Sequence, residues 1–190
     1  MVAECNSGSS STQPELPANS RLPDCAELWH WSLQLYPDVK NICLQWQDLH
    51  GANVNLLLLL LYLQRHQLFC SSDDMKLLQQ SLMVQQQFTL PLRQLRKTLP
   101  AGLDDKAAQQ MKQALLQAEL CSEQLEQQQL LATLPGCTLV PFPAAIAVCS
   151  QAERYLKLLG AEMSPALQQQ IVDLDQKAMQ LDFQTPKSLI

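Results

Sequence analysis

Charged residues are scarce in this sequence, and so are aromatic residues, glycine and histidine. Asp, Glu, Lys and Arg make up 16% of the 190 residues and aromatic residues 5%, and the net charge is −5. A nucleic-acid-binding surface needs clustered Lys and Arg, so this composition argues against nucleic acid as a partner. About one residue in seven is glutamine. Glutamine is polar, uncharged and a good helix former, so we expect solvated, glutamine-rich helix faces.

Signatures of catalytic and phosphate-binding sites are also missing. The sequence contains no Walker A loop, nucleophile elbow, dinucleotide-binding glycine motif or zinc-protease motif. Among its three histidines, His66 lies four residues before Cys70, a spacing that could place both on one metal, but no third ligand stands at a matching distance. The acid pairs at 73–74 and 104–105 lie at expected helix starts, where carboxylates interact favourably with the helix dipole. We therefore expect no metal and no cofactor, and we lean toward a protein without enzymatic activity.

Membrane-spanning and signal-peptide features are lacking as well. The main apolar run, Val54–Leu63 with six consecutive leucines, has about half the ~20 residues needed to span a bilayer. The first 12 residues contain neither a basic cluster nor an apolar core, so no signal peptide is expected. The seven cysteines include no C-x-x-C pair, which suits a reducing compartment. Four of them fall on apolar stripes: Cys25, Cys43, Cys121 and Cys149. We expect a cytoplasmic protein with no membrane partner.

The periodicity of the sequence predicts a single all-α domain over residues 22–183, a helical bundle of about seven helices. Residues 1–21 are rich in Ser, Asn and Pro and show no periodicity, which predicts a disordered N-terminal tail. Residues 184–190 are expected to form a short C-terminal tail.

Capping residues and helix breakers divide the first part of this domain into three helices. Asp24 begins the first helix, which we expect Pro37 to end. Asp38 begins the second, which Gly51 ends. The third helix, about 54–69, is apolar on all sides, so we expect it at the centre of the bundle.

Four further helices are expected in the remainder. The fourth begins at Ser71 and continues with a kink through Pro91, because its apolar stripe persists on both sides of the proline. The sixth ends at Gly160, and Ser164 with a first-turn proline begins the seventh. The fifth, about 104–134, carries a stripe of mostly small residues that permits close packing against another helix. The stripe consists of Ala107, Met111, Ala114, Ala118, Cys121 and Leu125.

Polar residues gather where the second helix ends and the buried third helix begins. One interpretation is a polar network that fixes this turn, with Asn53 as the helix cap. The alternative is a small polar-lined pocket or a partner-binding site. The candidate site residues, including two arginines that could equally be a solvated face, are Gln47, Asp48, Asn53, Asn55, Tyr62, Arg93 and Arg96. We expect Arg93 or Arg96 to donate to Asp48, because a carboxylate beside so apolar a helix needs a donor.

Three segments form a distinctive pattern in the first half of the chain. They are Trp29-x-x-Ser32-Leu33-x-x-Tyr36, Gln47-Asp48-x-x-Gly51-x-Asn53-Val54-Asn55-Leu56-Leu57-Leu58 and Leu92-Arg93-x-Leu95-Arg96. In this pattern, over about a fifth of its length, the chain resembles a family of proteobacterial proteins defined only as a domain of unknown function. The chain departs from the family pattern at Asp38, Trp46 and Asn53, where glycine, leucine and an acid are expected. The resemblance implies a bacterial, cytosolic, helical protein and brings no activity with it.

Two functions are open from the sequence. The first is a non-enzymatic protein-interaction or regulatory module with an unknown protein partner. The second is a small-ligand-binding protein or a helical enzyme that uses Asp48, Asn55 and the arginines at 93 and 96. Convergence of these side chains in an open cleft would favour the second function, and pairing in a closed core would favour the first.

Overall fold

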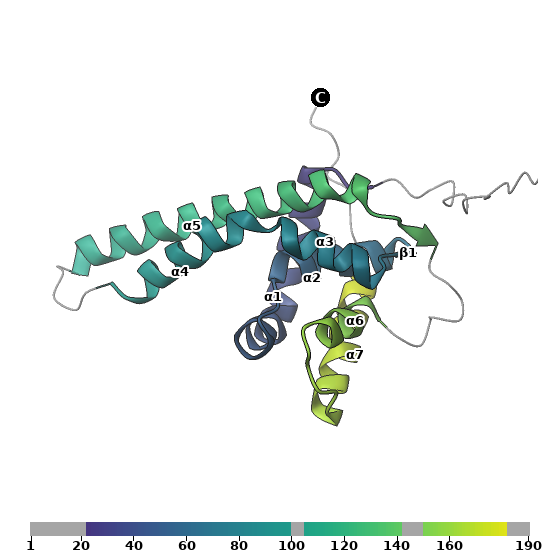
Figure 1. The fold of residues 1–190 in the computed structure, drawn as a ribbon. Coiled ribbons are helices and arrows are strands. Elements are labelled where there is room, and N and C mark those ends of the chain that lie inside the picture. Colours follow the sequence, from purple (N-terminus) through teal and green to yellow (C-terminus); the bar gives the residue numbers. More distant parts are fainter. Residues whose placement is uncertain (1–21, 100–104, 142–149, 182–190) are drawn as a thin grey trace, which may run out of the picture.

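The computed structural model describes residues 22–99, 105–141 and 150–181. The predicted tails, 1–21 and 184–190, lie outside these ranges. The described residues are almost entirely helical, which confirms the all-α prediction (Figure 1). In chain order the elements are α1 (Cys25–His50), α2 (Val54–Arg65), β1 (Leu68–Phe69), α3 (Ser72–Ser81), the π-helical turn η1 (Gln85–Thr89), α4 (Leu90–Lys97), α5 (Asp105–Thr133), the 3-10 turn η2 (Leu134–Gly136), β2 (Val140–Pro141), α6 (Gln151–Leu158) and α7 (Pro165–Gln180).

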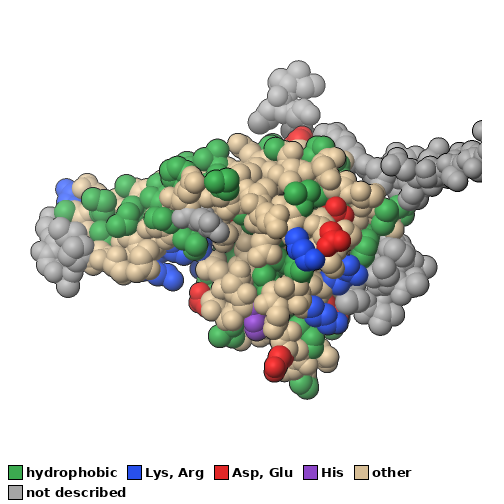
Figure 2. Space-filling view, in the orientation of Figure 1, with side chains coloured by type: hydrophobic (Ala, Val, Ile, Leu, Met, Phe, Trp, Pro, Cys, Tyr) green, Lys and Arg blue, Asp and Glu red, His purple; other side chains and the backbone are tan. Residues whose placement is uncertain are grey.

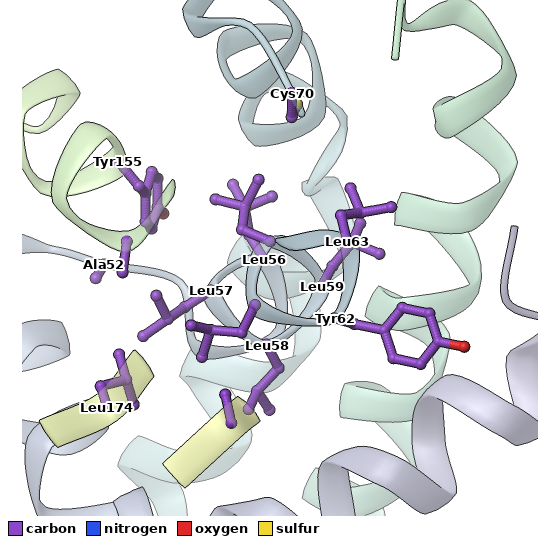
Figure 3. Packing of buried hydrophobic residues seen from close by; sticks show 14 of the residues in the cluster. Ala52, Leu56, Leu57, Leu58, Leu59, Tyr62, Leu63, Cys70, Tyr155 and Leu174 are labelled. Carbon is purple, nitrogen blue, oxygen red and sulfur yellow. The ribbon is translucent and has the colours of Figure 1, made fainter. Parts of the chain in front are cut away.

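The leucine-rich helix α2 lies at the centre of the molecule, as predicted. Every residue from Asn55 to Leu63 is buried, and α2 contacts α1, α5, α6 and α7. Figure 3 shows its leucines pointing outward in all directions, toward Tyr155 of α6 and Leu174 of α7 among others. Burial of each leucine contributes about 1.5–3 kcal/mol, so this helix provides much of the stability of the core. Among the described residues, no helix combines the length and apolar character needed to cross a membrane.

The third predicted helix is shorter than expected. It ends at Arg65, and Gln67 adopts a left-handed conformation with φ 58°. The chain then forms β1, which pairs in antiparallel fashion with β2 in a small two-stranded sheet. A two-residue strand is too short to show an alternating pattern in the sequence.

The first two predicted helices are one continuous helix, so the prediction that Pro37 ends a helix is wrong. Pro37 lies exposed inside α1, and apolar positions recur every three or four residues on both sides of it. The buried stripe consists of Leu28, Trp31, Leu35, Val39, Cys43 and Trp46. A proline inside a helix costs about 3 kcal/mol. Burial of one uninterrupted stripe along α1 exceeds that cost.

The prediction of one fourth helix that continues from Ser71 through a kink at Pro91 is also wrong. Ser71 and Asp74 form the predicted capping box, but α3 ends at Ser81, ten residues before Pro91, where the kink was predicted. A π-helical turn follows, and Pro91 lies in the first turn of α4. The break lies at Leu82, and the backbone is helical again from residue 83 through the π-helical turn into α4. Pro91 therefore lies within a helical segment that begins after the break, where the π-helical turn meets α4.

Helices α4 and α5 pack side by side and project from the other helices as an arm (Figure 1). The small-residue stripe predicted on α5 does not pack against the protein: Ala107, Met111, Ala114, Cys121 and Leu125 are exposed. The buried face of α5 is instead polar and consists of Glu119, Ser122, Glu126 and Gln127, followed by Leu130. Apolar periodicity therefore identified a real stripe but not the face that α5 buries.

The seventh helix and the end of the sixth match their predicted boundaries, but α6 begins only at Gln151, with Ser150 as its extended cap, so the predicted continuation of the sixth helix across residue 150 is wrong. Ser164 caps α7 by accepting a hydrogen bond from the Leu167 backbone N–H at 3.2 Å. Gly160, which ends the preceding helix, has φ 80°, a conformation that favours glycine. The predicted apolar stripe of α7 is buried at Leu167, Ile171, Leu174 and Ala178. The part of the sixth predicted helix before residue 150, including Cys149, lies outside the described residues.

Asp175 of α7 should make stability depend on pH. Burial raises the pKa of its carboxyl to about 6, although hydrogen bonds from Ser150 and Gln64 act in the opposite direction. The folded chain therefore binds this proton more tightly than the unfolded chain, and stability falls as the pH rises from about 4 to about 6. We expect Asp175→Asn to raise the free energy of unfolding by about 1–3 kcal/mol at pH 8 and to change it little at pH 4. Urea denaturation at both pH values measures this, and equal stability of the two proteins at pH 8 would contradict it.

Candidate functional site

Arg93 of α4 connects the arm to α1 by a hydrogen bond. Its Nη1 donates to Gln47 Oε1 of α1 at 2.6 Å. Its Nε and Nη2 donate to two carboxylates of α5, Glu119 at 2.7 Å and Glu123 at 2.9 Å. The Arg93 side chain is 16% exposed, so all three contacts are largely shielded from water. Three hydrogen-bonded contacts from one guanidinium fix α4, α5 and α1 relative to one another.

Glu119 is shared between two arginines. Arg96 Nε donates to Glu119 Oε2 at 2.6 Å, and Arg93 binds the other carboxylate oxygen. Burial alone would raise the pKa of Glu119, but the hydrogen bonds from Arg96 and Arg93 outweigh it and lower the pKa. Burial raises the pKa of Glu123 despite the nearby Arg93 charge. The cluster therefore holds a firmly ionised Glu119 between two guanidinium groups.

The expected pairing of an arginine with Asp48 is wrong. Asp48 is exposed, and the carboxylates that Arg93 and Arg96 bind are those of α5. Successive residues of a helix point about 100° apart. Gln47 therefore reaches Arg93, while Asp48 lies exposed beside it. A carboxylate in water needs no protein donor, which removes the reason for the predicted pair.

A second polar cluster is fully buried between α5 and the start of α2, and it is centred on Glu126. Glu126 Oε2 accepts hydrogen bonds from the side-chain amides of Asn53 at 3.0 Å and Asn55 at 2.9 Å. The Thr89 hydroxyl, at the end of the π-helical turn, donates to the other oxygen. Asn53 Oδ1 also caps α2 by accepting from the Leu56 backbone N–H at 2.7 Å, as predicted. The N-terminal end of α2 carries a partial positive charge, which favours an anion such as Glu126 in this position.

Gln127 continues this cluster toward α1. Its Nε2 donates to Ser32 Oγ at 3.0 Å and to Asn55 Oδ1 at 3.2 Å. Asn53 and Asn55 therefore both hold α5 against the start of α2. This arrangement accounts for the two asparagines as parts of a network that fixes the turn between α1 and α2.

Tyr62 and His66 lie elsewhere on α2. The Tyr62 hydroxyl donates to Glu27 Oε1 at 2.7 Å, and its ring stacks on His66 with centroids 4.4 Å apart. Burial lowers the pKa of His66, although Glu27 acts in the opposite direction. The described residues contain no group of three or more His, Cys, Asp or Glu side chains that could hold a metal.

Two neighbouring cavities that share lining residues lie at the junction between the arm and the other helices; the larger is called the outer chamber and the smaller the inner chamber. The outer one has a volume of about 420 Å³, and its lining includes Gln47, Asp48, Arg93 and Arg96. The inner one has a volume of about 90 Å³, and its lining includes Asn55. Residues that line both are Tyr36, Gln47, Arg93, Leu120 and Glu123. Of the predicted site residues, only Tyr62 and the cap Asn53 line neither chamber.

Four important residues of this region were not predicted: Glu119, Glu123, Glu126 and Gln127. They occur along α5 at spacings of three and four residues, which places them near one face. That spacing is the feature of the sequence that could have indicated a polar face on α5. Acidic residues and glutamines on a helix usually indicate a solvated face, and only contacts with distant segments distinguish this case.

The fold and the site define an all-α protein in which ion pairs join the two helices of the arm, and hydrogen bonds from and to side-chain amides attach the arm to α1 and to the start of the leucine-rich central helix. The chain belongs to the family described as "Protein of unknown function (DUF2390)", whose model matches residues 27–130. The matched residues extend from α1 into α5 and so include both polar clusters. Comparison with curated proteins found no match, and neither did comparison with solved structures.

Proposed function

We propose that this chain is a non-enzymatic interaction module of the bacterial cytoplasm, with a regulatory role, that binds apolar helix faces through α5. The observation that carries the proposal is the apolar stripe of α5, which the described residues leave exposed except at the half-buried Ala118. Met111 and Leu125 are each 49% exposed. Figure 2 shows hydrophobic side chains gathered along the arm. Large exposed apolar patches on soluble proteins commonly mark interaction surfaces.

The shape of the stripe suits a partner helix. Between Ala107 and Leu125 it extends over about 27 Å, at 1.5 Å of rise per residue. Ala114, Ala118 and Cys121 are small, so a second helix could approach closely between the larger side chains at positions 111 and 125. Exposed glutamines, at 110, 117, 124 and 128, border the stripe. An apolar centre with an uncharged polar rim is common in protein interfaces.

A second copy of the chain is the partner that this pattern favours. The order Met111, Ala114, Ala118, Cys121, Leu125 is large, small, small, small, large, and Ala118 stands at its midpoint. Two antiparallel α5 helices related by a twofold axis near Ala118 would place Met111 of each copy opposite Leu125 of the other. A twofold interface requires such self-complementarity. One helix pair buries less than the 1,200–2,000 Å² of a standard interface, so we expect a weak dimer, on the order of 10–100 µM.

The polar clusters support a role other than catalysis. Arg93, Arg96, Glu119 and Glu123 engage one another at the arm junction, so each of these four side chains has a structural partner. The cytoplasmic location is supported by the free thiols of the described cysteines, which suit a reducing compartment.

Sedimentation equilibrium of the full chain from about 5 µM to 1 mM tests this proposal. We expect mass to rise toward that of a dimer for the wild type, and Met111→Glu and Leu125→Glu to remain monomeric because each places a charge in the apolar interface. Leu49→Glu is the matched control, since Leu49 is 66% exposed on α1 and lies outside the stripe. A wild type that stays monomeric at 1 mM, or a Leu125→Glu variant that dimerises equally, would overturn the proposal.

A further inference from the structure

The outer chamber is rich in basic side chains. Those that line it come from α1 and α4 and are Lys40, Arg93, Arg96 and Lys97. The acidic side chains of its lining are Asp48, Glu119 and Glu123. Basic side chains therefore outnumber acidic ones in this cavity, although the net charge of the whole chain is −5. Figure 2 shows Lys and Arg side chains at the lower edge of the arm, close to the other helices.

The acids of α5 leave part of this positive charge unpaired. All three guanidinium nitrogens of Arg93 donate to α1 or α5. Arg96 instead binds Glu119 through Nε and Nη2 alone, so its Nη1 has no acceptor among the described residues. Lys40 and Lys97 form no ion pair with a described residue. Three cationic groups around one cavity thus have donors to offer.

These donors are accessible to a ligand. The Arg96 side chain is 33% exposed, and its Nη1 is not among the buried polar atoms that lack a partner. Lys40 and Lys97 are exposed. Because all three residues line the outer chamber, a molecule inside it can accept hydrogen bonds from them.

A neighbouring cavity adds to the charge at Arg96. This arm cavity has a volume of about 410 Å³ and shares Arg96 and Leu116 with the outer chamber. Its other lining residues are Gln109, Lys112 and Gln113, so no described acid lines it. Lys112 forms no ion pair with a described residue. The positive charge of the outer chamber is therefore reinforced on the side of α5 and not cancelled there.

We infer that the outer chamber binds a small organic anion, whose phosphate or carboxylate group lies between Lys40, Lys97 and Arg96 Nη1. Ammonium and guanidinium groups form strong, charge-assisted hydrogen bonds to such oxyanions. The volume of about 420 Å³ lies within the range of small-molecule pockets. Leu44, Leu116 and Leu120 line the same cavity and can contact the uncharged part of the ligand. The inference is independent of arm pairing, because none of these residues belongs to the α5 stripe.

Asp48 opposes this charge and therefore provides a test of sign. It lies on α1, eight residues after Lys40, and lines the outer chamber without an arginine or lysine partner among the described residues. Its carboxylate repels an oxyanion bound nearby. Removal of the Asp48 charge should therefore strengthen binding of an anion, whereas removal of a lysine charge should weaken it.

Pyrophosphate and citrate serve as probes, because they carry phosphate and carboxylate groups respectively. Titration of the full ¹⁵N-labelled chain at constant ionic strength, followed at the Arg96 Nε–H signal, measures binding. We expect saturable binding of at least one probe, with a dissociation constant on the order of 0.1–1 mM. Tighter binding of pyrophosphate identifies a phosphate-bearing ligand, and tighter binding of citrate identifies a carboxylate; each result supports the inference.

Single substitutions of exposed residues locate the bound anion. Lys40→Gln and Lys97→Gln should each weaken binding about fivefold, since each removes a charge-assisted hydrogen bond. Lys76→Gln is the matched control, because it makes the same change of charge on α3, outside both cavities, and it should leave the affinity unchanged. Asp48→Asn should strengthen binding about twofold.

Three results would each overturn the inference. They are no saturable shift of the Arg96 signal with either probe up to about 10 mM, equal affinities of the Lys97→Gln and Lys76→Gln variants, and weaker binding by Asp48→Asn than by the wild type.

Discussion

Replacing Glu126 with methionine is expected to lower the free energy of unfolding by about 2–4 kcal/mol. The thioether has nearly the same length as the carboxylate but accepts hydrogen bonds poorly. The substitution leaves the Asn53 and Asn55 amides without their shared acceptor in a buried region, whereas the Thr89 hydroxyl can still donate to Ser122 Oγ. Each unpaired buried donor costs about 1–3 kcal/mol, partly offset because a buried charge is also removed. Urea denaturation followed by far-ultraviolet circular dichroism measures the loss.

Glu126→Gln is the matched variant, and it should cost less than about 1.5 kcal/mol. The amide oxygen can accept from both asparagines, and the amide nitrogen can donate to Thr89 Oγ1. The Thr89 hydroxyl can then donate to Ser122 Oγ, which lies 3.0 Å away. Glutamine therefore satisfies every member of the cluster without a charge. A methionine variant as stable as the wild type would show that the network adds no stability, and a glutamine variant as unstable as methionine would show that the charge itself is required.

The central position of α2 could be predicted because its signal is local. Asn53 is a cap residue, the helix after it is apolar on all sides, and Gly51 marks the end of the helix before it. The continuity of α1 through Pro37 could not be predicted in the same way. A proline penalty is visible in the sequence, but the burial of Trp31 and Trp46 that exceeds it depends on helices far along the chain.

The candidate site shows the same division between local and distant information. Asn53, Asn55, Arg93 and Gln47 were identified from residue type and position, and the structure places all four in the two polar clusters. The partners of Asn53, Asn55 and Arg93 on α5 lie 26 to 73 residues away in the sequence, and Gln47 binds Arg93 of α4, 46 residues away. No capping rule or periodicity connects segments at that distance. Asp48 was expected to need an arginine because it lies beside the apolar helix in the sequence, and its exposure to water removed that need.

A single charge in the middle of α2 should prevent folding altogether. Leu61 is 1% exposed and lies within the run of nine consecutive buried residues of this helix. An unpaired buried carboxylate costs several kcal/mol, and loss of the leucine side chain adds about 2–5 kcal/mol. Together these approach the 5–15 kcal/mol that stabilises a typical domain. We expect Leu61→Asp to show no cooperative thermal transition by circular dichroism.

Leu49→Asp is the control for that experiment, because it makes the same substitution at a leucine that is 66% exposed. It should melt within a few degrees of the wild type, since a surface substitution usually changes stability by less than about 0.5 kcal/mol. The two variants have the same composition and net charge, so a difference between them reflects position alone. If Leu61→Asp retained a cooperative transition near that of Leu49→Asp, α2 would not be the helix on which the core is built, and the six-leucine run would need an explanation other than burial within the chain.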